Sequence, residues 1–118
     1  MRFLSLIRIN ENSGLVPSEK LMGDMGQLID ELTRAGKMVA TAGLRPTREA
    51  KRIRMRQGKL TTLDGPFIET KEVIGGYAML EADSMEEALE LTRRFMRLHE
   101  PVWEFECEVR QLEGSCTE

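Results

Sequence analysis

The sequence contains few of the residues that build metal or redox sites. Its 118 residues include two cysteines and one histidine, and aromatic residues make up only 5%. Cys107 lies in an alternating segment and Cys116 in a polar tail, so the two have neither C-x-x-C spacing nor the number that a disulfide framework needs. We therefore expect no metal and no cofactor, with Cys107 as a buried small hydrophobic residue.

The sequence also lacks long apolar runs and an excess of positive charge. No run approaches the roughly 18 apolar residues of a membrane helix, and residues 1–10 lack the small-residue cleavage site of a signal peptide. Lys and Arg number 17 against 20 Asp and Glu, a net charge of −3. We expect a cytoplasmic protein without membrane contact and without direct nucleic-acid binding, because phosphate binding needs a concentrated positive surface.

The length predicts one domain, residues 1–112, followed by a polar tail at residues 113–118. A chain of this size buries roughly 65% of the surface that its unfolded form exposes. Hydrophobic residues make up 41% of the sequence, which is ordinary for a globular domain. Such a domain needs no disulfide or metal to fold.

Two helices are predicted from apolar spacing and from their end signals. Ser18 is a candidate N-cap of the first helix and Gly36 ends it, whereas Ser84 and Glu87 form the S-x-x-E pattern of a capping box at the second. The predicted strands are rich in β-forming residues or alternate in polarity, and they cover residues 2–9, 38–44, 50–57, 60–63, 73–81 and 103–110. The Gly-Gly pair inside 73–81 predicts a bulge or a close backbone approach.

The order of these elements is strand, helix, strands, strand, helix, strand. This is the split βαβ pattern of a ferredoxin-like α+β sheet, with an extra hairpin inserted after the first helix and a turn at residues 57–59. Two helices on one side leave the other face of the sheet open. Several strands, however, have apolar residues at both odd and even positions, so both of their faces are apolar. We expect a second copy of the chain to cover that face, which gives a homodimer.

The most distinctive segment is DGPFIETKE at residues 64–72. In it Asp64 can accept backbone N–H bonds in a turn, Gly65 is expected at a torsion that other residues resist, and Phe67 is expected to be an apolar plug. The segment resembles the signature motif of the YCII-related, or DGPF-domain, family. Shorter matches extend the resemblance over nearly the whole chain: Gly43-Leu44-x-Pro46, Gly75-Gly76-Tyr77, Glu87-Ala88 and Glu108-x-Arg110-Gln111.

The resemblance implies a ferredoxin-like subunit that pairs as a dimeric α+β barrel. Members of the family are mostly uncharacterised. Some relatives are proposed to use a His and Asp pair for elimination or isomerisation, and others accompany sigma factors of the extracytoplasmic-function type. Residues 2–9, where some relatives have the histidine, contain none here, and the single histidine is His99.

Asp64 and His99 are the candidate catalytic residues. Asp64 could act as a general base in a cleft or accept backbone hydrogen bonds in its turn. His99 could exchange a proton near neutral pH or interact with the C-terminal end of a helix. The candidate ligand-binding residues are Arg45, Lys71, Phe67 and Tyr77. The two cations among them would anchor an anion, or they are solvated surface charges.

A basic strand face is expected where Arg52, Arg54 and Arg56 alternate with apolar residues. These arginines are predicted to pair with glutamates of a neighbouring strand, including residues 104, 106 and 108, as a cross-strand charge ladder. Nucleic-acid binding is the alternative use of this face.

Two function classes stay open at this point. The first is a small-molecule-binding domain or an accessory and regulatory domain linked to a sigma factor. The second is a lyase or isomerase that acts on a small anionic or aromatic substrate by acid and base chemistry.

Overall fold

A computed structural model of the chain describes residues 1–67 and 72–114. Lys71, Cys116 and most of the predicted tail lie outside the described residues. The elements follow one another as β1 (Arg2–Ile9), α1 (Glu19–Arg34), β2 (Met38–Gly43), the short 3-10 helix η1 (Thr47–Glu49), β3 (Lys51–Arg56), β4 (Lys59–Asp64), β5 (Val73–Glu81), α2 (Met85–Met96) and β6 (Glu106–Gln111). No helix in the described residues is long and apolar enough to span a membrane.

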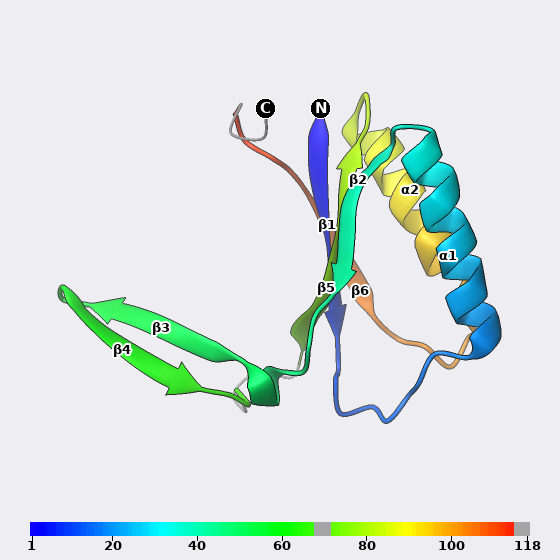
Figure 1. The fold of residues 1–118 in the computed structure, drawn as a ribbon. Coiled ribbons are helices and arrows are strands. Elements are labelled where there is room, and N and C mark those ends of the chain that lie inside the picture. Colours follow the sequence, from blue (N-terminus) through cyan, green and yellow to red (C-terminus); the bar gives the residue numbers. More distant parts are fainter. Residues whose placement is uncertain (68–71, 115–118) are drawn as a thin grey trace.

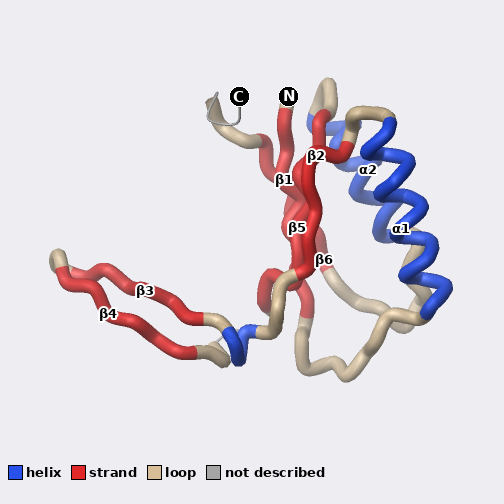
Figure 2. The backbone as a smooth tube through the Cα atoms, in the orientation of Figure 1, coloured by secondary structure: helices blue, strands red, loops and turns tan. Residues whose placement is uncertain are grey.

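Four strands form one antiparallel sheet in the order β2-β5-β1-β6. Both helices lie against the same face of this sheet (Figures 1 and 2). The protein is therefore an α+β protein, and its arrangement is compatible with the predicted ferredoxin-like fold. The register between β1 and β5 shifts at Gly75, which confirms the predicted bulge at the Gly-Gly pair.

The helix ends follow the predicted signals. The Ser18 hydroxyl accepts a hydrogen bond from the Leu21 N–H at 3.1 Å, and the Ser84 hydroxyl accepts one from the Glu87 N–H at 3.1 Å. Gly36 follows α1 with a φ of +74°, the left-handed conformation that ends many helices. These caps satisfy backbone groups that the helices leave without partners.

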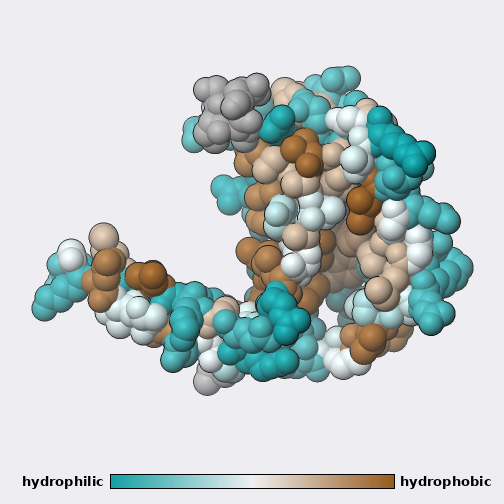
Figure 3. Space-filling model, in the orientation of Figure 1, coloured by the Kyte–Doolittle hydropathy of each residue, from teal (hydrophilic) through white to brown (hydrophobic). Residues whose placement is uncertain are grey.

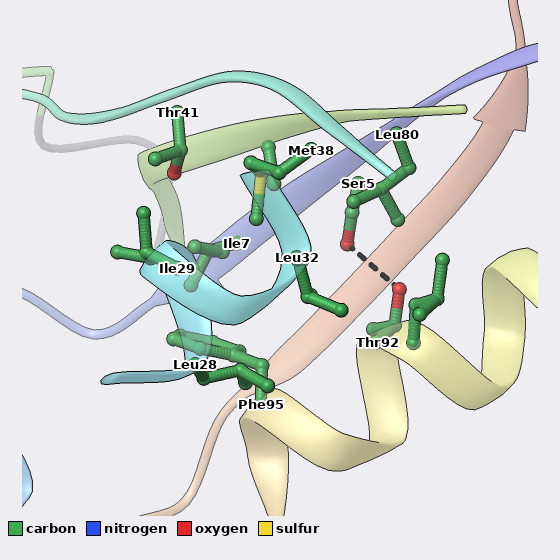
Figure 4. Close-up of a pocket in the computed structure, with 12 residues that line it drawn as sticks. Ser5, Ile7, Leu28, Ile29, Leu32, Met38, Thr41, Leu80, Thr92 and Phe95 are labelled. Atoms are coloured by element: carbon green, nitrogen blue, oxygen red, sulfur yellow. Dashed lines mark hydrogen bonds between the residues drawn. The ribbon is translucent and has the colours of Figure 1, made fainter. Parts of the chain in front are cut away.

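The core lies between the helices and the sheet. Phe3, Ala82 and Ala88 are its most deeply buried cluster, with exposed fractions of 1% or less. A cavity of about 50 Å³ remains beside them, and Figure 4 shows the side chains around it. The cavity contains a buried polar pair, because the hydroxyl groups of Ser5 and Thr92 lie 3.3 Å apart.

The opposite face of the sheet carries apolar side chains without a helix layer. Phe3 and Ser5 are buried on the helix side, so Leu4 and Leu6 point to the other face. Their cross-strand partners on β5 are Met79 and Tyr77, which share that face. We call this surface the open face. Its apolar side chains agree with the prediction from strands that are apolar at both parities.

Strands β3 and β4 pair only with each other among the described residues and form a separate two-stranded sheet. This hairpin, residues 51–64, projects away from the body on the side of the open face (Figure 1), and we call it the arm. The turn at its tip has positive φ at both central residues, Gln57 and Gly58, as a tight hairpin turn requires. The radius of gyration is 16.1 Å, above the about 13.5 Å expected for a compact chain of this length.

Two predictions about strands need correction. The last strand begins at Glu106 instead of residue 103. Trp103 lies before this strand, in a turn where its backbone N–H donates to the Glu100 carbonyl. Its ring packs against His99. The cross-strand ladder is also wrong, because β3 pairs with β4 whereas β6 pairs with β1.

Candidate functional site

Two of the short matches, Gly43-Leu44-x-Pro46 and Gly75-Gly76-Tyr77, lie with the start of the 64–72 motif near the base of the arm. The Gly65 N–H donates to the Ala50 carbonyl at 2.9 Å, which joins the two chain ends of the arm. The Leu44 N–H donates to the Gly75 carbonyl at 2.9 Å, which ties the segment after β2 to the bulge of β5. The motifs therefore build the connection between the arm and the sheet.

Glu11 adds a further link at this base. Its carboxylate accepts hydrogen bonds from the hydroxyl and, at 3.1 Å, from the backbone N–H of Thr47. These bonds, with the hydroxyl contribution the larger, lower the pKa of Glu11 below its ordinary value. The carboxylate thus stabilises the start of η1 in its charged form.

Gly65 is required here for a reason that differs from the predicted one. It is not among the described residues with positive φ. Instead, a Cβ at Gly65 would overlap the Thr47 carbonyl oxygen and would lie 2.8 Å from its carbon and 3.2 Å from the Ala50 oxygen. Close approach of two backbone segments, and not a left-handed torsion, excludes a side chain at this position.

A cavity of about 540 Å³ lies on the open face. This volume is within the range of small-molecule sites. It is lined by residues of β1, β3, β5 and β6 and of the segment before β5, namely Leu6, Arg8, Arg52, Glu72, Val73, Ile74, Glu108 and Arg110. Three arginines from three different strands, together with Glu72 and Glu108, therefore surround the apolar side chains of Leu6, Val73 and Ile74. We call it the open-face cavity.

Arg8 is held by carboxylates of the cavity and its rim. Its guanidinium lies 3.6 Å from Glu108, 3.7 Å from Glu72 and 4.0 Å from Glu106. Arg110 has a longer contact, 3.9 Å from its Nε to Glu108. Glutamates of β6 that were predicted to meet the arm's arginines thus contact Arg8 and Arg110 instead.

Phe67 and Tyr77, candidate ligand-binding residues from the sequence, are not among the lining residues, but each is next to one of them. The Arg52 guanidinium lies over the Phe67 ring, 3.7 Å from its centroid. Tyr77 is half-buried and is the cross-strand partner of Leu6, a lining residue. An aromatic ring thus contacts one of the three arginines, Arg52.

Arg45 is placed differently. It binds Glu49 through two hydrogen bonds of 3.1 and 3.0 Å, and its side chain is 81% exposed. It is not among the residues that line the open-face cavity. Its role as an anion anchor stays a prediction, and so does that of Lys71, which lies outside the described residues.

The two candidate catalytic residues have different surroundings. The Asp64 carboxylate forms an ion pair of 2.6 Å with Lys51 across the arm, and its side chain is 74% exposed. His99 lies among the rings of Phe95, Trp103 and Phe105, with centroid distances of 5.0, 5.7 and 4.6 Å. Their shared catalytic role stays a prediction.

His99 also interacts with the end of α2, as one of the two readings of the sequence predicts. Its Nδ1 lies 3.2 Å from the Phe95 carbonyl oxygen, and its backbone N–H donates to the Met96 carbonyl at 3.2 Å. In the described part of the chain, no hydrogen bond or ion pair joins His99 to Asp64.

Sequence reasoning did not select Arg8, Glu72 or Arg110 as site residues. Each of the three has a feature in the sequence that could have pointed to it. Arg8 is a charge inside an otherwise apolar strand, Glu72 closes the motif at 64–72, and Arg110 lies on the charged side of the last strand. Within residues 1–67 and 72–114, no group of three or more His, Cys, Asp or Glu side chains is arranged to hold a metal ion.

Comparison with known proteins finds one family and an uncharacterized relative. The YCII-related domain matches residues 1–106. An uncharacterized protein of Rhizobium meliloti (strain 1021) is 36% identical over 75 residues, which are 64% of this chain and 60% of the relative. The chain thus spans less than two thirds of that relative's length. Because the match to the family covers most of the sequence, the chain belongs to the YCII-related domain family.

Proposed function

We propose that this protein is a small-molecule-binding domain that holds an organic anion in the open-face cavity. The observation that carries the proposal is the convergence of Arg8, Arg52 and Arg110, from three strands, around apolar side chains. Guanidinium groups bind carboxylates in a two-point geometry that also fixes orientation. A ligand with one anionic end and one apolar end fits this combination.

The three arginines have different tasks in this proposal. Arg8 already has three carboxylates within 4.0 Å, so its role is to hold the acidic residues in place. Among the described residues, Arg110 has only the long contact to Glu108, and its side chain is 72% exposed, so it can turn toward a ligand. Arg52 would add a second positive charge next to the Phe67 ring. The apolar part of the ligand would lie on Leu6 and Ile74.

A homodimer is part of the proposal. The open face carries half-buried Leu4, Leu6, Tyr77 and Met79, and a second copy packed against it would bury the same patch twice. Such packing would cover the cavity and remove water from it. Charge interactions between arginine and ligand strengthen when water is excluded.

The enzymatic alternative, a lyase or isomerase that uses Asp64 and His99, would need both residues to reach one substrate. The contacts described above give each of them a structural partner instead. A link to a sigma factor is supported by the family resemblance alone. Binding without catalysis is therefore the function that the geometry favours.

The experiment is a calorimetric titration with benzoate as the anionic probe and benzyl alcohol as its neutral counterpart. Removing a charged partner costs about 1.5–3 kcal/mol, so Arg110→Gln should weaken benzoate binding about tenfold or more. The matched control is Arg34→Gln, an exposed arginine of α1 outside the cavity, which should leave binding unchanged. Equal affinity for both probes, or no heat with benzoate at millimolar concentration, would contradict the proposal.

A further inference from the structure

The arm exposes more apolar surface than a hairpin can stabilise alone. Ile53, Met55 and Leu60 are 71%, 68% and 65% exposed. Met55 and Leu60 face each other across the two strands, and Ile53 lies on the same side two residues along β3. An isolated two-stranded hairpin is marginal in water. The arm therefore needs a surface to pack against.

We propose that the arm packs against a second copy of this chain, so that each subunit of a dimer holds the other with its own hairpin. The inference rests on the homodimer in the proposed function and adds to it the segment that makes the contact. Its apolar side is formed by Ile53, Met55 and Leu60. Figure 3 shows hydrophobic atoms both on the arm and on the side of the body that the arm faces, with a recess between them.

Charge favours a second copy as the occupant. The arm carries five Lys and Arg against one Asp, which is +4 on a chain of net charge −3, so the rest of the chain carries −7. Within the arm, the arginines at 52, 54 and 56 lie on the side opposite the apolar residues. In a dimer, the positive arm of one copy is therefore attracted to the negative body of the other copy.

The dimensions also fit a second copy. A strand of six residues, the length of β3 and of β4, spans about 20 Å at ~3.4 Å per residue. Sheets that pack face to face lie about 10 Å apart. If two open faces meet, an arm that projects from one sheet passes the partner's sheet and reaches the level of its helices.

The base of the arm is built to hold it in place. Both of its chain ends are joined by the bond between Gly65 and Ala50, and Lys51 and Asp64 form an ion pair of 2.6 Å at the same level. A Cβ at Gly65 would disturb this junction. The DGPF segment thus fixes the direction in which the arm leaves the body, which a contact with a partner requires.

The test measures the dimer dissociation constant by analytical ultracentrifugation. Ile53→Ser/Leu60→Ser removes the apolar side of the arm, and Arg54→Gln/Arg56→Gln reduces its charge. The control is Val16→Ser, another highly exposed apolar residue but outside the arm. We expect the dimer dissociation constant of the first variant to be at least 100-fold higher than that of the wild type. The second variant should raise the dissociation constant by a larger factor at low salt than at high salt. Circular dichroism checks that each variant stays folded.

The outcomes separate this inference from the proposed function. If the wild type is a dimer and the Ile53→Ser/Leu60→Ser variant keeps its affinity, the arm contact is refuted while the dimer stands. If the wild type stays monomeric at all concentrations, both are refuted, whereas benzoate binding still tests the cavity by itself. Salt-sensitive binding of random duplex DNA that Arg54→Gln/Arg56→Gln abolishes, with dimerisation unchanged, would assign the arm to nucleic acid and overturn the inference.

Discussion

Gly65→Ala is the substitution for which the structure gives the clearest energetic expectation. The added Cβ would overlap the Thr47 carbonyl oxygen, with the carbonyl carbon at 2.8 Å and the Ala50 oxygen at 3.2 Å. These neighbours are backbone atoms, so relief requires the segment at 47–50 to move. That movement also weakens the 2.9 Å bond from the Gly65 N–H to the Ala50 carbonyl.

The expected cost combines two effects. Forced shifts in a packed region cost about 1–3 kcal/mol, and a lost hydrogen bond costs about 0.5–1.5 kcal/mol. The free energy of unfolding of Gly65→Ala should therefore fall by about 2–4 kcal/mol, a large part of the about 5–15 kcal/mol of a typical domain. The assay is urea denaturation followed by circular dichroism.

Gly23→Ala is the matched control for this substitution. Gly23 is exposed in α1 and a Cβ there has nothing within 4 Å, so alanine should raise the denaturation midpoint. The expected gain is about 0.5–1 kcal/mol, because glycine is a poor helix former. An unchanged midpoint for Gly65→Ala would refute the argument that close backbone approach requires glycine at this position.

Two further predictions concern the body of the protein. Hydrogen bonds from the Asp83 N–H and then from Lys37 lower the pKa of Glu87 below its ordinary value of 4.5. The stability that the charged carboxylate contributes is therefore present above pH 4.5 and is lost as the pH falls through the lowered pKa. Glu87→Gln should reduce the loss of stability as the pH falls below 4.5, and an unchanged pH profile would contradict this. Thr92→Val removes the hydroxyl that bonds to Ser5 and donates to the Ala88 carbonyl, and it should cost about 1–2 kcal/mol. In a double-mutant cycle with Ser5→Ala the two costs should sum to more than the cost of the double variant, whereas strict additivity would show that the hydroxyl pair is not coupled.

The sequence predicted the body of the fold because its signals are local. Ser18, Gly36 and Ser84 mark helix ends through contacts a few residues away, and the structure confirms each of them. The Gly-Gly pair in β5 predicted the bulge in the same way. Alternation also predicted the hairpin at 51–64, but not its separation from the main sheet.

What the sequence did not predict depends on contacts between distant segments. Alternation of charges indicated that residues 104, 106 and 108 need positive partners, but it could not indicate which strand supplies them, and Arg8 of β1 does so for Glu106 and Glu108. The open-face cavity could not be predicted for the same reason, because two of its arginines, Arg52 and Arg110, are 58 residues apart in the sequence. The sequence pattern predicts the start of β6 three residues too early, because the aromatic residues before it alternate like a strand but pack around His99.

The most direct test of the proposed function is to observe the arginine side chains by NMR while benzoate is added. The Nε–H signals of Arg52 and Arg110 and the methyl signals of Leu6 and Ile74 should shift together and saturate with one dissociation constant, with benzyl alcohol causing no such change at the arginines. Arg110→Gln should raise that dissociation constant, and the control Arg34→Gln should leave it unchanged. Shifts centred on Arg45 or on His99, with the residues of the open-face cavity unaffected, would contradict the proposal.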